Sequence, residues 1–540
     1  MAATEAEKHG VNDASSSNGA RSDEEGGQVL VRDLKGRHMQ MIAIGGAIGA
    51  GLFVGSGGAL YSGGPAPLVI CYTVVGFMLL FTCQALAELA VLYPVNGAFY
   101  TYVVRFLDPS WGFAVGWDYV LSWLTILPFE LIAASITIRY WNQAISPGVW
   151  ITMFLVLLIG IQFWGVRGYG EVEFALSMIK IAACAGFIIL GIIINVGAVG
   201  EKGYLGTRYW SELGAFKNGF NGFASVFVVA AFSFGGTELV GLAAAESQNP
   251  RKAIPKASKQ VFWRILFFYI LNLFILGLIL PSDDPRLKES SGANSKASPF
   301  VLAIEDAKIK VLPDIMNGVI TLAVISVANS CTFGSTRTMQ AMAAGGMAPK
   351  ALQKIDSKGR PIYCTLIQLA FGLLAYIALA GEKIAESFFT WLLALSGLSY
   401  FFIWGSICLT HIRFRAAWKA QGYPLEAIPY RPRLGVYGSY IGLSLNILCL
   451  LATFYSALWP SPSAKPNAET FFTSYLAAPV VISLWVFWKL KSGNWRILTP
   501  LMEIDLKTDL KALDLADGAD DDADSSVGLG FWKRFGKWLC

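Results

Sequence analysis

Charged residues are scarce in this sequence. Only 15% of its 540 residues are charged, whereas about a quarter of a typical soluble domain is charged. Hydrophobic residues make up 55% of the chain, and the mean hydropathy is +0.52. A chain of this composition lacks the charge to cover a soluble surface of its size. Because a membrane-spanning helix needs roughly 20 apolar residues, the composition predicts an all-α polytopic membrane protein.

Histidine is rarer still, and cysteine occurs without metal-binding spacing. The three histidines, His9, His38 and His411, lie outside the cores of the apolar stretches, which argues against catalysis by imidazole. The eight cysteines form no pattern typical of metal sites. No GxxxxGK(S/T) phosphate loop and no basic stripe for nucleic acid are present. We therefore expect no enzyme activity, no metal and no nucleic-acid partner.

Twelve apolar stretches lie between two polar tails. Their approximate limits are 39–60, 68–92, 113–138, 149–165, 173–197, 219–244, 260–281, 312–338, 362–381, 386–410, 435–459 and 471–490. We expect a disordered N-terminal tail at 1–38, a twelve-helix membrane domain at 39–490 and a C-terminal tail at 491–540. No apolar core of a signal peptide precedes the first stretch.

The C-terminal tail combines segments of opposite charge. An acidic segment at 517–526 precedes a basic, aromatic run at 531–539. That run is either a solvated tail or a helix that rests on an anionic leaflet. The last residue, Cys540, is a candidate for lipid attachment.

Basic residues follow the even-numbered stretches. They are Arg251, Lys252, Lys256 and Lys259 after the sixth, Lys350, Lys354, Lys358 and Arg360 after the eighth, and Arg413, Arg415, Lys419, Arg431 and Arg433 after the tenth. The connections after odd-numbered stretches are short or mixed in charge. By the positive-inside rule, the even connections and both tails are predicted to be cytoplasmic.

Two of the apolar stretches carry glycine clusters in matching positions. The first contains IGGAIGAGLF at Ile44–Phe53, and the sixth contains FSFGGTEL at Phe232–Leu239. Each glycine costs a helix about 1 kcal/mol relative to alanine. Unwound backbone is tolerated in a membrane only where protein buries it or where it lines a cavity. Such a pair of broken helices indicates an inverted-repeat transporter, here five plus five helices with two extra ones; the alternative is close helix packing on glycine.

The broken helices would bring unpaired backbone groups into the membrane. The N-terminus of a half-helix offers amide N–H groups to a carboxylate, and the C-terminus offers carbonyls to an ammonium group or a cation. An α-amino acid carries both groups at a fixed separation. The two breaks together therefore favour a site for an amino acid over glycine packing.

Ionisable residues inside the apolar stretches are further functional candidates, because they are costly in a membrane. Glu238 lies in the sixth stretch, where it could bind a substrate amine, relay a proton or pair structurally. Lys180 is central in the fifth stretch, either in a structural ion pair or as a cation or proton site. Glu130 lies at the far end of the third stretch. For Glu88 and Asp118, nearer the predicted cytoplasmic side, we expect solvent contact or gate pairing.

Three long motifs resemble one known family. LKGRHMQMIAIGGAIGAGLFVGSG at Leu34–Gly57 looks like the opening signature of fungal amino acid permeases of the amino acid–polyamine–organocation superfamily. ESQNPRKAIPKASKQVFWRI at Glu246–Ile265 and WLLALSGLSYFFIWGSICLTHIRFR at Trp391–Arg415 match the family's loop after the sixth span and its tenth span. The likeness covers about residues 30–500 and is greatest to the general amino acid permeases, including AFSFGGTELVGLAA at Ala231–Ala244.

The resemblance implies a proton-coupled symporter that imports amino acids across the plasma membrane, with the proton as coupling ion and no other cofactor. The substrate-site residues that it implies are Gly46, Ala47, Ile48, Gly49, Ala50, Gly51, Glu130, Phe232, Ser233, Phe234, Thr237 and Glu238, with Asn329, Ser330 and Trp391 as weaker correspondences. Lys180 matches a lysine that replaces the sodium ion of sodium-coupled relatives, and its ammonium would repel such an ion. The partners expected are amino acids, membrane lipid and ubiquitin ligases acting on Lys8 or Lys35.

Two departures from the family pattern concern specificity. Ala50 replaces a threonine that the family often has, and this removes a hydroxyl from the predicted carboxylate site. Gly235 stands where alanine is common, which would loosen the break in the sixth stretch. A permease of broad specificity is the main prediction; a permease of narrower specificity and a transporter-like amino acid sensor are the alternatives.

Overall fold

A computed structural model describes residues 34–289, 298–356, 359–459 and 466–510 of the chain. Helices make up almost all of its regular structure, and the one β-bridge among these residues pairs Leu34 with Ser247. Several predictions lie outside the described residues: the N-terminal tail before Leu34 with Lys8, the acidic and basic segments of the C-terminal tail, and Cys540.

Ten helical segments in the described part of the chain are long and apolar enough to cross a membrane. They follow predicted stretches two to eleven: α3 (Pro65–Leu92), α5 (Pro109–Arg139), α6 (Pro147–Trp164), α7 (Val166–Asn195), α9 (Gly219–Phe234) with α10 (Leu239–Leu242) and η2 (Ala243–Glu246), α11 (Pro250–Arg264) with η3 (Ile265–Leu271) and α12 (Asn272–Ile279), α15 (Leu312–Ala344), α16 (Ile362–Gly372) with η5 (Leu373–Ala380), α17 (Glu382–Ala420) and α18 (Gly435–Leu458).

The first and last predicted stretches are divided into shorter helices. The first consists of α1 (Gly36–Gly45), the π-helical turn η1 (Gly51–Gly55) and α2 (Ser56–Gly63). The last consists of α19 (Ala468–Tyr475) and α20 (Ala477–Ser492). The glycine cluster of the first stretch thus interrupts a helix, as its composition predicts.

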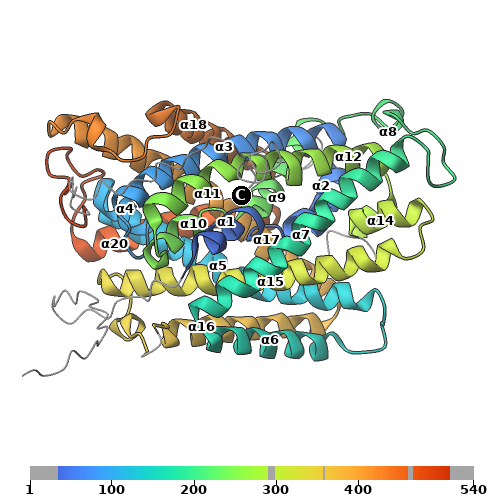
Figure 1. The fold of residues 1–540 in the computed structure, drawn as a ribbon, viewed down its shortest axis with the longest axis horizontal. Coiled ribbons are helices and arrows are strands. Elements are labelled where there is room, and N and C mark those ends of the chain that lie inside the picture. The colour runs from blue at the N-terminus through green and yellow to red at the C-terminus, as the bar shows by residue number, and fades with distance from the viewer. Residues whose placement is uncertain (1–33, 290–297, 357–358, 460–465, 511–540) are drawn as a thin grey trace, which may run out of the picture.

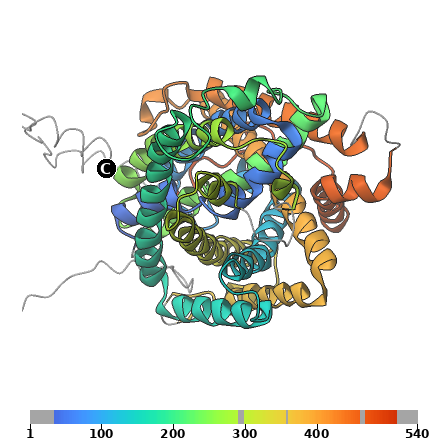
Figure 2. The same cartoon turned by 90° about the vertical axis from the view of Figure 1, so that its right-hand side faces the viewer.

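The long helices run side by side, and Figure 2 looks roughly along them. α5 and α15 pack along their length. α1 packs against α7 and α11, whereas α9 packs against α17 and α3. α7 packs against α15, and α17 packs against α5. α6 lies beside α5, and α16 lies beside α15. Apart from α5–α15, each of these contacts therefore has a counterpart in which both helices are replaced by those five spans away.

The two ends of the bundle differ in charge and structure. The connecting helices α8 (Arg208–Ser211) and α14 (Pro299–Asp306) lie at one end in Figure 1, and α4 (Phe99–Phe106) lies at the other. The second end carries the basic connections after η2, α15 and α17, and we call it the basic end.

The chain after α20 crosses the basic end as an ordered segment. We call residues 494–510 the C-terminal strap. The Thr499 N–H donates to the Leu107 carbonyl at 2.8 Å, and the Tyr93 hydroxyl donates to the Leu506 carbonyl at 2.9 Å. Gln421 of α17 donates to the carbonyls of Leu501 and Ile504 at 3.0 and 2.8 Å. The first part of the predicted C-terminal tail is therefore packed against the membrane domain.

Candidate functional site

The helix break in the first stretch lies in close contact with the sixth. A Cβ added to Gly51 would lie 2.7 Å from Cα of Ser233 and 2.9 Å from the Phe232 ring. A Cβ added to Gly49 would lie 2.4 Å from the Val327 side chain of α15. No larger residue fits at these two positions without displacing its neighbours. The glycines thus allow close packing and also lie where the helix is interrupted.

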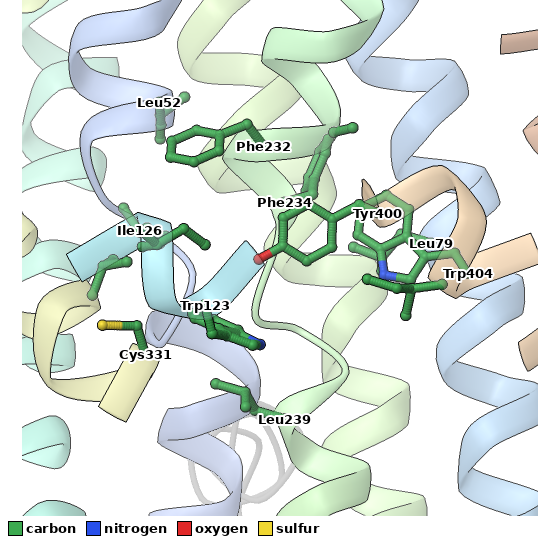
Figure 3. Close-up of a cluster of buried hydrophobic side chains, with 14 of the residues drawn as sticks. Leu52, Leu79, Trp123, Ile126, Phe232, Phe234, Leu239, Cys331, Tyr400 and Trp404 are labelled. Atoms are coloured by element: carbon green, nitrogen blue, oxygen red, sulfur yellow. The ribbon is translucent and has the colours of Figure 1, made fainter. Parts of the chain in front are cut away.

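The second break separates α9 from α10 at Gly235–Glu238. Gly236 has φ of +94°, a conformation that favours glycine. A Cβ added to Gly235 would lie 2.2 Å from the Tyr400 ring of α17. In Figure 3 the Tyr400 hydroxyl points toward the connection between α9 and α10, with Phe234 and Trp404 nearby. The departure from alanine at Gly235 therefore makes room for Tyr400.

Tyr269 of η3 joins the two breaks. Its hydroxyl lies 3.2 Å from the Ala47 carbonyl and 2.8 Å from the Ser233 carbonyl. The Ser233 hydroxyl in turn lies 2.8 Å from the Tyr72 hydroxyl of α3. A phenol hydroxyl in this position supplies a donor to carbonyls that the helix breaks leave free. Movement of either broken helix would change the hydrogen bonds of Tyr269.

Glu238 is fully buried and held by neutral donors. Its Oε1 accepts hydrogen bonds from the Tyr119 hydroxyl and from the Gly236 N–H, both at 3.2 Å. Its Oε2 accepts one from the Trp404 indole at 3.3 Å. Of the roles left open by the sequence, this arrangement favours a structural one, because protein groups already occupy both oxygens.

Glu130 of α5 is also buried, with 1% of the residue exposed. Its surroundings differ from those of Glu238. Its Oε2 has no hydrogen-bond partner among the described residues. Its carboxyl lies beside the Ala50 amide and faces Gly49. The helix resumes directly after these residues, with η1 beginning at Gly51. Backbone amides at the start of a helix, beside an unused carboxylate oxygen, are what a zwitterion with a carboxylate and an ammonium group requires.

Aromatic rings close the space beside these polar groups. Phe232 packs edge-to-face on Phe129, with ring centroids 4.7 Å apart, and Phe129 stacks on Phe389 of α17 at 3.9 Å. Phe232 is 7% exposed, and the residues from Gly46 to Phe53 are buried. We call this the closed state, because both the first break and Phe232 are shielded from solvent.

Lys180 of α7 forms a buried ion pair with Glu173 of the same helix, and both side chains hydrogen-bond to α15. Its Nζ lies 3.4 Å from Glu173 Oε1 and 2.8 Å from the Ser326 hydroxyl. Glu173 also accepts hydrogen bonds from Ser326 at 2.7 Å and from Ser330 at 3.3 Å. The structural ion pair considered for Lys180 is therefore present. The pair lies where α7 and α15 meet, so relative movement of these helices would change its hydrogen bonds to Ser326 and Ser330.

The weaker candidates are dispersed. Asn329 faces α6, where its Oδ1 accepts a hydrogen bond from Gln162 at 3.0 Å. Ser330 faces Glu173 of α7, and Trp391 is partly buried in α17, two residues after Phe389. Thr237 lies at the second break, where it accepts a hydrogen bond from the buried Arg264 at 2.5 Å. Of these residues, only Thr237 lies within either break.

Carboxylates toward the basic end form a separate set. Glu88 of α3 lies 2.6 Å from Arg415 and 3.1 Å from His411, both in α17. Of the two expectations for Glu88, the structure shows pairing and not solvent contact. Asp118 accepts a hydrogen bond from the Ser399 hydroxyl at 2.8 Å. Within the described residues, no group of three or more His, Cys, Asp or Glu side chains could hold a metal ion.

Sequence reasoning missed several residues of the site. Glu173 lies seven residues before Lys180, two helical turns away on the same face, and that spacing was its available signal. Arg264 lies just inside the predicted seventh stretch, after a run of loop cations. Tyr269 and Trp404 carry no signal of their own in a chain with 20 tyrosines and 17 tryptophans.

Comparison with known proteins extends this description. The family model "Amino acid permease" matches residues 38–499. A protein named general amino-acid permease from Candida albicans is 51% identical, covering 90% of this chain and 82% of its own length. Cationic amino acid transporter 1 of Schizosaccharomyces pombe is 48% identical, covering 96% of this chain and 88% of its own. An amino-acid permease of Hypocrea atroviridis is 50% identical, covering 88% and 85%.

Proposed function

Because the chain belongs to the amino acid permease family, we propose that it is a proton-coupled symporter. It imports L-amino acids across the plasma membrane by alternating access, and its specificity is broad. The family makes it a multi-pass transporter and not an enzyme. The proposal includes three properties beyond membership of the family: protons as the coupling ion, broad specificity and the plasma membrane as the location.

The single observation that carries the proposal is the meeting of the two helix breaks beside Glu130. A zwitterionic amino acid would place its carboxylate at the backbone amides where the helix resumes after the first break and its ammonium group toward Glu130 Oε2. Phe232 would cover the side chain of the substrate. Because backbone amides contact only the groups common to all amino acids, this site tolerates many side chains.

The helix contacts support an inverted-repeat architecture of twelve spans. Exchanging the first span with the sixth, and so on to the fifth with the tenth, leaves the pattern of packed pairs unchanged. The α1–α7 contact then corresponds to the α9–α17 contact, and α7–α15 corresponds to α17–α5. Two repeats of this kind can rock against each other around a site at their interface. Such rocking supplies the alternating access.

The ion pair of Lys180 and Glu173 is the proposed coupling element. Both side chains are fully buried, and Lys180 contacts Glu173 on its own helix and Ser326 on α15. If the two helices separate, the ammonium keeps Glu173 but loses its hydrogen bond to Ser326, and its proton becomes easier to release, since a buried charge with fewer hydrogen bonds is costly. A fixed ammonium here also disfavours sodium as the coupling ion.

The available driving force is adequate for concentrative uptake. One positive charge that moves inward across 100 mV releases about 2.3 kcal/mol. A difference of one pH unit adds about 1.4 kcal/mol. Together they would sustain roughly several hundred-fold accumulation of a neutral amino acid.

The alternatives are a permease of narrower specificity and an amino acid sensor. The names of the relatives include both a general permease and a cationic amino acid transporter. At 48–51% identity the chain is similar to both. Ala50 remains the position to examine first if specificity is narrow.

The experiment that tests the proposal is uptake of labelled neutral, acidic and basic amino acids into cells without their own permeases. Uptake is measured at external pH 5 and 7.5, with and without a protonophore. We expect accumulation of all three classes, stronger at pH 5 and abolished by the protonophore. Accumulation of one class would establish narrow specificity. The absence of uptake by protein at the cell surface would favour the sensor.

A further inference from the structure

A groove on the outer surface of the bundle, near its basic end, has no role in the transport site. It lies between the second half of α11, residues 256–263, and the segment 429–433 that precedes α18, and α3 also lines it. The three helices lie side by side in Figure 1. The cavity has a volume of about 930 Å³, and Leu80 and Gln84 of α3 line its base.

Four exposed cations surround this groove. Lys256 and Lys259 extend from α11, and Arg431 and Arg433 come from the opposite wall. None of the four has an ion-pair partner in the described part of the chain, and no carboxylate lines the cavity. A second cavity, of about 600 Å³, shares Arg431 and Arg433 and adds Lys419. The groove therefore concentrates positive charge that the protein itself leaves uncompensated, which makes it a site for an anion.

Apolar side chains continue from the cations toward the centre of the membrane. Phe262 lines the groove and is 36% exposed. Trp263 also lines it and stacks on the exposed Phe267 of η3, with ring centroids 5.7 Å apart. On α3, the exposed Phe77 precedes Leu80 and Gln84 on one helix face. Cations at the end of the bundle and an exposed aromatic track beside them match an amphiphile with an anionic head.

We propose that this groove binds the headgroup of an anionic phospholipid of the inner leaflet, with its acyl chains along Phe77, Phe262 and Phe267. Tryptophan and phenylalanine at this level suit the membrane interface, and basic pockets between helices on the cytoplasmic side bind anionic headgroups. A soluble polyanion would use the cations alone and would gain nothing from the aromatic track. The two chemistries are therefore separable by experiment.

The bound lipid would act on the transport machinery through α11. This helix packs against α1, and its residue Arg264 donates to Thr237 at the second break. A headgroup that bridges Lys256 to Arg431 would fix α11 against the segment before α18. We therefore expect the lipid to stabilise the closed state described above.

The test uses the full-length purified protein and two matched double variants. Lys256→Gln/Lys259→Gln removes two cations of the groove. Lys350→Gln/Lys354→Gln removes two exposed cations from another connection at the same end. Binding of phosphatidylinositol 4,5-bisphosphate and of phosphatidylserine is measured by native mass spectrometry and by the shift in melting temperature, with phosphatidylcholine as reference.

We expect both anionic lipids to bind in preference to phosphatidylcholine and the groove variant to bind them about 30-fold more weakly. The control variant should stay within about twofold of the parent. Equal losses in the two variants would reduce the effect to general charge attraction and overturn the site. Arg431→Gln/Arg433→Gln repeats the test on the opposite wall if the first variant does not fold.

Soluble inositol phosphate separates a lipid site from a site for free phosphate. We expect it to bind at least tenfold more weakly than the corresponding lipid, because it lacks the acyl chains. Equal affinity would contradict the lipid assignment. These outcomes do not depend on which amino acids the protein carries or on its coupling ion.

Discussion

Replacement of Lys180 distinguishes a coupling residue from a structural one, provided that its partner is replaced too. Lys180→Met alone leaves the buried carboxylate of Glu173 without its cation. Removal of one partner of a buried pair costs about 3–5 kcal/mol. Glu173 keeps hydrogen bonds from Ser326 and Ser330, at 2.7 and 3.3 Å. We therefore expect the cost at the lower end, about 3 kcal/mol, and reduced amounts of protein at the surface.

The double variant Glu173→Gln/Lys180→Met removes both charges and leaves no unpaired ion. The hydroxyl groups around position 173 can still hydrogen-bond to the glutamine amide. We expect this variant to recover most of the stability that the single variant loses. Surface amounts and melting temperature measure that recovery.

Transport by the double variant then reports on the proton. If Lys180 carries it, the double variant exchanges external for internal amino acid but no longer accumulates substrate, and its uptake loses its dependence on pH. The accumulation ratio falls from several hundred to about one. A double variant that accumulates substrate as the parent does, with the same response to pH and protonophore, would refute the coupling role and leave a structural pair.

Three further predictions concern the site and the strap. Glu130→Gln should lower uptake about tenfold with little change in melting temperature, because Oε2 of Glu130 has no hydrogen-bond partner among the described residues. Glu238→Gln should impair transport and also lower the melting temperature, because it disturbs three hydrogen bonds. The opposite ranking in uptake and thermal assays would contradict this division of roles. Gly235→Ala should cost about 1–3 kcal/mol by displacing Tyr400, whereas Gly405→Ala, with its nearest contact at 3.5 Å, should be neutral in the same melting assay; equal melting temperatures would show that the ring moves freely. Gln421→Ala should speed proteolysis within the C-terminal strap, since it removes two hydrogen bonds to it, and unchanged cleavage would show that other contacts suffice to hold the strap.

The sequence predicted the helices and their breaks well because both depend on local composition. Apolar stretches of about 20 residues set the spans, and α5, α18 and the segment from the start of α9 to the end of η2 begin and end within a few residues of their predicted limits. Glycine clusters set the breaks, since their cost to a helix is local as well. The predicted limits were wrong where a helix continues beyond the apolar stretch. α17 runs to Ala420, ten residues past its predicted end.

The site was only partly predictable because side-chain direction depends on packing between helices. Glu130 and Glu238 were found as buried acids, but nothing in the sequence separates the one with a free oxygen from the one held by Tyr119 and Trp404. Asn329 lies two positions from Val327 on α15, and that rotation turns it toward α6 and away from Gly49. The sequence alone cannot provide such orientations.

The most direct test of the central claim is uptake by the purified protein in sealed liposomes that contain no sodium. An inward proton gradient and an inside-negative potential are imposed, separately and together, and accumulation of a labelled neutral amino acid is followed. We expect the proton gradient and the membrane potential each to drive accumulation, and the two together to give the highest accumulation. We also expect a protonophore to abolish accumulation while exchange of substrate continues. Accumulation that requires sodium, or transport that never exceeds equilibration under either gradient, would contradict proton symport.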